Sequence, residues 1–196
     1  MKSYAIANVD GPPDEQFFIR VADLAEAGVG TIQLRAKSLE GRELFEVAAR
    51  MRSITAGKSS FLVNGRADVA IASGADGVHL PARGLPVEAV RALGKHLIVG
   101  RSCHSRADVR IAAAAGCDYV LFGPLFETRS KPGSAAISRC DLIAAASDSC
   151  DVYALGGLSL DNLQQLAGTG IAGIAGITLF MRDLPVAEIV EAIRAI

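Results

Sequence analysis

Short β-branched runs alternate with longer helical patterns along this 196-residue chain, and this alternation restricts the fold more than any other feature. Several of the runs are continuously apolar, which is typical of strands covered on both faces. The predicted strands are Tyr4–Val9, Thr31–Arg35, Phe61–Asn64, Gly77–Leu80, Leu97–Arg101, Tyr119–Gly123, Val152–Leu155 and Gly173–Thr178.

Helix start signals lie between these strands. Residues 12–15 place prolines and acids in a first helical turn, and Ser105 with Asp108 forms a capping-box pattern. Ser159 is expected to cap the helix that follows the seventh strand. The last predicted helix is Val186–Ile196.

Strict alternation predicts a parallel sheet with right-handed crossovers. Eight βα units without a change of texture predict an α/β fold with one domain over residues 1–196, a single (β/α)8 TIM barrel. An open doubly wound sheet is the alternative, usually with fewer strands.

Composition excludes several classes of function. The net charge of −1 provides no field that would attract nucleic acid or anionic lipid. The four cysteines show neither zinc nor disulfide spacing, so no metal site is expected from them. With no apolar segment of membrane-spanning length and no signal-peptide pattern, we expect a soluble, cytoplasmic protein that contacts no membrane. Phe17, Phe18 and Phe45 allow a homodimer, and ordinary core packing explains them equally well.

Polar residues gather where the predicted strands end, which in a barrel is the rim that holds the active site. Cations dominate this rim although the chain is slightly acidic, so the rim suits an anionic ligand. The candidate ligand-binding and catalytic side chains are Gln33, Arg35, Lys37, Asn64, His79, Ser102, His104, Glu127, Thr128, Ser130 and Lys131.

A phosphate site is predicted after the last two strands. The pair Gly156-Gly157 lets backbone N–H groups approach a phosphate, and Ile177 with Thr178 can complete the cup. Ordinary turn glycines are the competing interpretation.

Structural roles also compete at the other positions. Arg35 or Lys37 alone would be a solvated strand end, and His79 between Val78 and Leu80 fits a hydrogen-bonded interior histidine equally well. His104 has a local backbone contact as its alternative role. For Glu127, the alternative role is an ion pair with Arg129 or Lys131.

The ordered set of motifs resembles the thiamine phosphate synthase/TenI family, whose members are (β/α)8 barrels. The resemblance covers nearly the whole chain. It rests on Gln33-Leu34-Arg35-x-Lys37, Asn64-x-Arg66, Ala75-Asp76-Gly77-Val78-His79-Leu80, Gly100-x-Ser102-x-His104, Asp118-Tyr119-Val120, Gly123-Pro124-Leu125-Phe126-x-Thr128-x-Ser130-Lys131 and Gly156-Gly157.

The resemblance implies roles for these residues. A synthase would couple a pyrimidine pyrophosphate to a thiazole phosphate with Mg²⁺. The pyrimidine pyrophosphate would then face Arg35, Lys37, Asn64, Ser102 and Lys131. The thiazole phosphate would contact Thr128, Ser130, Gly156, Gly157 and the amides of Ile177 and Thr178.

Two departures from the synthase pattern concern the metal. Synthases typically carry an acid directly after the Asn64 position and another just beyond His79-Leu80, where this chain has Gly65 and the run 81–84 without an acid. Because Mg²⁺ prefers carboxylate oxygens, we expect no metal cofactor, and Mg²⁺ only if the chain is a synthase.

These departures favour the TenI branch, which includes metal-independent thiazole tautomerases that aromatise a thiazole carboxylate phosphate by proton transfer. Characterised tautomerases place a catalytic histidine where this chain has Pro124, so we expect His104 or Glu127 to move the proton. Lys37 or Lys131 would stabilise the developing charge. A synthase, a non-catalytic thiazole or thiamine phosphate-binding protein that acts through a partner, and a phosphate-binding barrel enzyme of another pathway remain alternatives.

Overall fold

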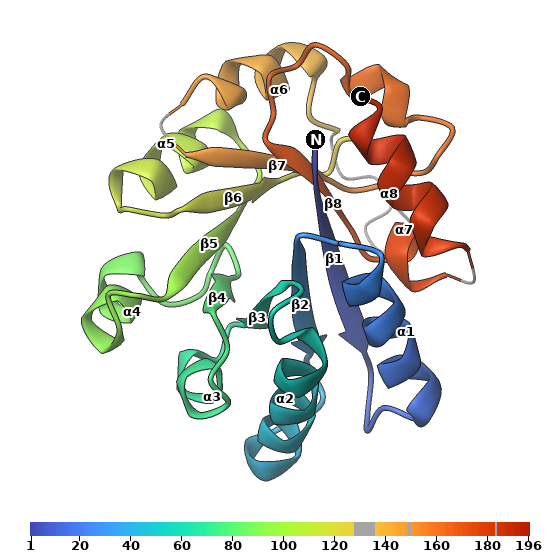
Figure 1. The fold of residues 1–196 in the computed structure, drawn as a ribbon. Helices are drawn as coiled ribbons and strands as arrows, with labels where there is room; N and C mark the ends of the chain where they lie inside the picture. Colours follow the sequence, from blue (N-terminus) through green and yellow to red (C-terminus); the bar gives the residue numbers. More distant parts are fainter. Residues whose placement is uncertain (128–135, 149, 183) are drawn as a thin grey trace.

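The computed structural model describes residues 1–127, 136–148, 150–182 and 184–196, and it has a closed barrel of parallel strands in the order β1 to β8. Helices lie outside the strands, as Figure 1 shows. The closed order confirms the (β/α)8 barrel and excludes the open doubly wound sheet. The two termini meet, since the Met1 amino group donates to the Ile193 carbonyl at 3.2 Å.

The observed elements follow the predicted ones closely. The strands are β1 Lys2–Val9, β2 Thr31–Ala36, β3 Ser60–Asn64, β4 Gly77–Leu80, β5 Ile98–Cys103, β6 Tyr119–Phe122, β7 Asp151–Leu155 and β8 Gly173–Gly176. The helices are α1 Glu15–Glu26, α2 Gly41–Thr55, α3 Ala67–Ala72, α4 Val87–Leu93, α5 Arg106–Ala114, α6 Arg139–Ala146, α7 Thr178–Met181 and α8 Val186–Arg194, with a 3-10 helix, η1, at Leu163–Leu166.

Side chains alternate between two apolar layers. Strand residues such as Val78 and Leu80 point outward and pack against the helices in the larger core. A smaller cluster fills the barrel interior, and it includes Tyr4, Tyr119 and Tyr153. The barrel interior is therefore partly polar, and this polar part leads to the site.

Two of the predicted helix starts are confirmed. The Asp14 side chain accepts the Phe17 N–H at the start of α1, and Ser105 with Asp108 forms a reciprocal capping box at α5. These caps satisfy backbone donors that would otherwise lack partners at the helix start.

The helix predicted to run through Leu163 and Leu166 is present only as the four-residue 3-10 helix η1, and the predicted cap at Ser159 is wrong. Among the described residues, η1 is the only helix between β7 and β8, and the Ser159 N–H donates to the Asn162 side chain at 2.9 Å. Asn162 also donates to the Gly157 carbonyl, so its amide holds a turn in place of a helix start. Strand β8 is shorter than predicted, because Thr178 begins α7.

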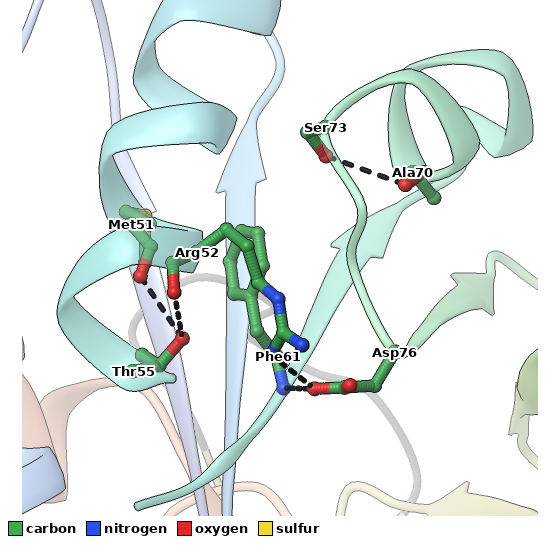
Figure 2. A network of polar contacts seen from close by, with 7 residues as sticks. All are labelled: Met51, Arg52, Thr55, Phe61, Ala70, Ser73 and Asp76. Carbon is green, nitrogen blue, oxygen red and sulfur yellow. Dashed lines mark hydrogen bonds and ion pairs between the residues drawn. The ribbon is translucent and has the colours of Figure 1, made fainter. Parts of the chain in front are cut away.

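An aspartate clamp lies at the amino-terminal end of the barrel. Asp76 Oδ2 accepts the Phe61 N–H at 2.7 Å and an Arg52 N–H at 3.0 Å, which joins α2, β3 and the start of β4 (Figure 2). Asp118 repeats the arrangement before β6, accepting the Val99 N–H and an Arg91 N–H at 2.7 Å each. The Ala75-Asp76-Gly77 and Asp118-Tyr119 motifs therefore stabilise the end of the barrel opposite the rim.

Phe18 is buried, Phe17 packs partly against the core and Phe45 is 40% exposed, so core packing explains the first two. Across the described residues, every helix is too short or too polar to cross a bilayer.

Candidate functional site

The side chains of four neighbouring strands form a polar row inside the barrel, leading to the carboxyl-end rim. Gln33 on β2, Asn64 on β3, His79 on β4 and Ser102 on β5 are each next to at least one residue that packs in the outer apolar core. Gln33 and His79 are buried, whereas Asn64 and Ser102 are partly accessible. Of these four side chains, only Asn64 and Ser102 can therefore meet a ligand.

Hydrogen bonds connect this row through two buried tyrosines. Gln33 Nε2 donates to Asn64 Oδ1 at 3.1 Å, and the Tyr4 hydroxyl donates to Gln33 Oε1 at 2.7 Å. The hydroxyls of Tyr4 and Tyr119 lie 2.8 Å apart, and the Tyr119 hydroxyl lies 3.0 Å from His79 Nδ1.

The row ends at a histidine–serine contact. His79 Nε2 lies 2.8 Å from Ser102 Oγ. Burial lowers the pKa of His79 to about 3, and it raises the pKa of Tyr4 and Tyr119 far above neutrality. All three rings are therefore neutral at pH 7. Because burial disfavours the protonated imidazole, His79 is a poor base for activating Ser102.

The interior histidine predicted as an alternative for His79 is thus confirmed, with the addition that its ring contacts the accessible Ser102. Its outward neighbours Val78 and Leu80 pack against helices.

The rim cations differ in how far they are free for an anion. Arg35 donates to Asn8 Oδ1, and Lys37 is exposed. Arg66 pairs with Asp68 at 2.6 Å, while Arg101 donates to the carbonyls of residues 82 and 85. Arg35 and Lys37 are the better candidates for binding an anion, because Arg66 is neutralised by Asp68 and Arg101 holds a loop, whereas Arg35 bonds to an uncharged side chain.

His104 projects from the exit of β5 to the exit of β6. Its Nδ1 lies 2.6 Å from the Gly123 carbonyl, which only accepts, so Nδ1 carries the hydrogen. In the neutral ring, Nε2 is then left as an acceptor. The contact is with the backbone of the next strand, 19 residues along the chain, and not the local one expected as the alternative role of His104. It leaves Nε2 as a nitrogen suited to a general base. Glu127 is exposed at the same loop.

The glycine pair after β7 is required by packing. Gly156 and Gly157 have φ values of +104° and +66°, which favour glycine. A Cβ at Gly156 would lie 2.7 Å from Pro124, and one at Gly157 would lie 2.6 Å from Phe126 Cβ. The turn-glycine interpretation is confirmed, and the predicted phosphate contact stays a prediction.

The other predicted phosphate ligands lie after β8. Ile177 is partly buried and Thr178 is exposed at the start of α7, where the first N–H groups have no partner within the helix. Thr128, Ser130 and Lys131 lie outside the described residues.

The donor set near the exits of β3 and β4 does not fit a magnesium site made of protein carboxylates. Gly65 follows Asn64, and the run 81–84 holds Arg83 but no acid. The neighbouring Asp68 carboxylate pairs with Arg66. Within the described ranges, no three His, Cys, Asp or Glu side chains are grouped so that they would hold a metal ion.

Sequence reasoning missed Asn8, Tyr4 and Tyr119. Period-two alternation would have placed all three inside the barrel, but it gave no reason to connect phenols near the strand starts with the rim. Tyr4, Tyr119 and Tyr153 also line a cavity of about 410 Å³ at the amino-terminal end, next to Lys2 and Asp151.

Comparison with known proteins gives consistent matches. Residues 3–180 match the family model described as "Thiamine monophosphate synthase". A thiamine-phosphate synthase of Methanoculleus marisnigri is 39% identical, over 87% of this chain and 82% of the relative. One of Haloarcula marismortui is 36% identical, over 89% and 86%. The solved thiamine phosphate pyrophosphorylase from Pyrococcus furiosus superposes with a TM-score of 0.84 at 30% identity, covering 99% of this chain and 94% of that one.

Proposed function

The chain belongs to the thiamine monophosphate synthase family, and from that premise we propose that it joins a pyrimidine pyrophosphate to a thiazole phosphate, releasing pyrophosphate. The observation that carries the proposal is the hydrogen-bonded row from Asn64 to Ser102, which offers two polar groups to a heteroaromatic ring at the rim. Relatives named thiamine-phosphate synthase support this transfer over the isomerisation that the sequence alone favours.

The proposed reaction makes one demand on the chain. A bond forms between the thiazole nitrogen and the pyrimidine methylene carbon while the carbon–oxygen bond to pyrophosphate breaks, and the electron pair leaves with pyrophosphate. Positive charge must meet the departing anion. We assign this role to Arg35 and Lys37, with Lys131 as a third cation.

Mg²⁺ is implied by the family, but the residues at the exits of β3 and β4 do not fit it. We therefore propose that side-chain cations neutralise the charge of the pyrophosphate, and we assign no role to a protein-held metal ion.

The second candidate is the metal-independent thiazole tautomerase. One observation favours it: His104 donates through Nδ1 to the carbonyl of Gly123, the residue before Pro124, where characterised tautomerases carry their histidine, and it keeps Nε2 as an acceptor. In this reaction Nε2 would take a proton from one ring position, and the same imidazolium or Glu127 would return a proton to another.

A single set of NMR assays tests both candidates. The purified protein receives pyrimidine pyrophosphate with thiazole phosphate, and separately the thiazole carboxylate phosphate tautomer, each with Mg²⁺ and with EDTA. We expect thiamine phosphate and pyrophosphate to form in equal amounts. Lys37→Ala should slow this coupling at least about tenfold. Lys58→Ala, which removes a lysine paired with Glu26, is the matched control.

The outcomes separate the alternatives. Isomerisation that survives EDTA and disappears in His104→Ala would establish the tautomerase in place of the synthase. Coupling that stops completely in EDTA would show that a metal ion takes the charge assigned here to side chains. Binding of thiamine phosphate without turnover of either substrate would leave a non-catalytic binding protein.

A further inference from the structure

The chain of hydrogen bonds between Asn64 and Ser102 has a direction, because each hydroxyl in it has one hydrogen. The Gln33 Oε1 can only accept, so Tyr4 gives its hydrogen to Gln33. Tyr4 must then accept from Tyr119 across their 2.8 Å contact. With its own hydrogen used in that bond, Tyr119 must accept from His79 Nδ1.

The direction continues through the imidazole to the rim. A neutral histidine carries one ring hydrogen, and here it lies on Nδ1, so Nε2 accepts from Ser102 Oγ–H. Ser102 is left with lone pairs only. At the other end Gln33 donates to Asn64 Oδ1, so the Asn64 NH₂ group remains available.

We propose that Tyr4 and Tyr119 are positioning residues that carry the direction fixed by the Gln33 amide to His79, so that Asn64 presents hydrogen-bond donors and Ser102 presents an acceptor to a ligand at the rim. Both tyrosines are buried, at 1% and 5% exposure, and neither needs to touch the ligand. The direction itself is independent of the proposed function, and only its consequence for the pyrimidine ring rests on it.

The opposite direction would also give every donor in the chain an acceptor, so the orientation of the Gln33 amide decides which of the two is adopted. If the Gln33 amide turned over, all the bonds would reverse together. Asn64 would then present its oxygen and Ser102 its hydrogen. A ligand ring with an amino group at Ser102 can donate a hydrogen bond only if the chain has the direction seen in the structure. With that direction, an oxo group at the same place would put two acceptors opposite each other.

The tautomer of His79 in the ligand-free protein tests the direction. Long-range ¹H–¹⁵N NMR correlations distinguish a hydrogen on Nδ1 from one on Nε2, and the chain has only three histidines to assign. We expect Nδ1–H in the wild type. Tyr4→Phe and Tyr119→Phe remove the constraint and should populate Nε2–H. A merely structural role of the tyrosines would leave the tautomer unchanged.

Tyr153→Phe is the matched control. The Tyr153 ring packs against those of Tyr4 and Tyr119, with centroid distances of 5.6 and 5.8 Å, but its hydroxyl takes no part in the described hydrogen-bond chain. The Nδ1–H tautomer should persist in this variant.

Binding of thiamine phosphate and of oxythiamine phosphate, in which an oxo group replaces the amino group of the pyrimidine, tests the consequence. We expect the amino form to bind at least about tenfold more tightly to the wild type. This ratio should narrow in Tyr4→Phe and stay the same in Tyr153→Phe.

Three results would overturn the inference. They are a hydrogen on His79 Nε2 in the wild type, a hydrogen retained on Nδ1 in both Tyr4→Phe and Tyr119→Phe, or a loss of Nδ1–H in Tyr153→Phe as large as in those two variants. The first needs no variant, so it decides the matter even if Tyr4→Phe fails to fold. If neither thiamine compound binds while the tautomer behaves as expected, the proposed function fails and the direction of the chain stands.

Discussion

Gly100 and Tyr119 face each other inside the barrel, on the paired strands β5 and β6, and a Cβ at Gly100 would fall within the Tyr119 ring, nearest to Cζ. The Tyr119 ring therefore occupies the space that a side chain at residue 100 would need. Since the Tyr119 hydroxyl contacts both Tyr4 and His79, the absence of a side chain at residue 100 is a condition for the whole polar row.

Gly100→Ala should destabilise the protein by about 3 kcal/mol, because the ring must leave its site and the hydrogen bonds break with it. Urea unfolding measures the change. Gly74→Ala is the control, since Gly74 has φ +68° but open space around it and should cost about 1 kcal/mol from its backbone conformation alone. Equal costs for the two variants would contradict the packing argument.

Asp76→Asn and Asp118→Asn should each lower the free energy of unfolding by about 1 to 3 kcal/mol, because the amide replaces a charged acceptor shared by a strand N–H and an arginine. The two clamps join different strands, so their effects should add in the double variant. Asp68→Asn, in an exposed pair, should cost less than about 1 kcal/mol. Denaturant titrations of the four variants and the wild type measure these changes. An Asp76→Asn variant as stable as the wild type would show that the clamp does not stabilise the barrel.

His79 predicts a loss of stability in mild acid. Its pKa is lowered from 6.5 to about 3 in the folded protein, so below pH 6.5 the unfolded chain binds a proton that the folded chain does not. The stabilisation is complete above pH 6.5 and declines as the pH falls toward 3. Between pH 7.5 and 5.0 the loss from this one group is about 2 kcal/mol.

The matched variants isolate the histidine from the carboxylates. His79→Gln should remove this part of the pH dependence, whereas His96→Gln, at an exposed position, should retain it. Identical pH dependences in both variants and the wild type would mean that the pKa of His79 is the same in the folded and unfolded chains.

Arg101→Lys should loosen the loop between β4 and α4. The guanidinium donates to the carbonyls of Ala82 at 2.7 Å and Leu85 at 3.2 Å, and an ammonium group cannot reproduce this two-point contact. Hydrogen exchange across residues 81–86 should become faster. In Arg66→Lys, whose side chain pairs with Asp68 two residues away, that loop should exchange as in the wild type.

Much of the barrel could be predicted from the sequence, because strand periodicity and helix caps depend on residues that are close together in the chain. The strand at Gly77–Leu80 was predicted with its observed bounds, and the Ser105–Asp108 box begins α5 as expected. The helix after β7 is shorter and begins later than predicted, because Asn162 bonds to both the Ser159 N–H and the Gly157 carbonyl and so holds a turn before η1.

The sequence also placed most site candidates at one rim, since parallel strands bring their carboxyl ends together. It did not distinguish Arg35, bonded to Asn8, from Arg101, which holds a loop, because both are cations at strand ends. Side-chain partners far apart in the chain decide such roles.

The sequence by itself determined the eight-stranded barrel, the family and the rim, because periodicity, caps and motif order are properties of neighbouring residues. Only the tertiary structure decided that Tyr4, 115 residues from Tyr119, completes the hydrogen-bond chain that orients His79. Hydrogen-bond direction depends on which single acceptor each buried hydroxyl finds, and that is set when the barrel closes and excludes water.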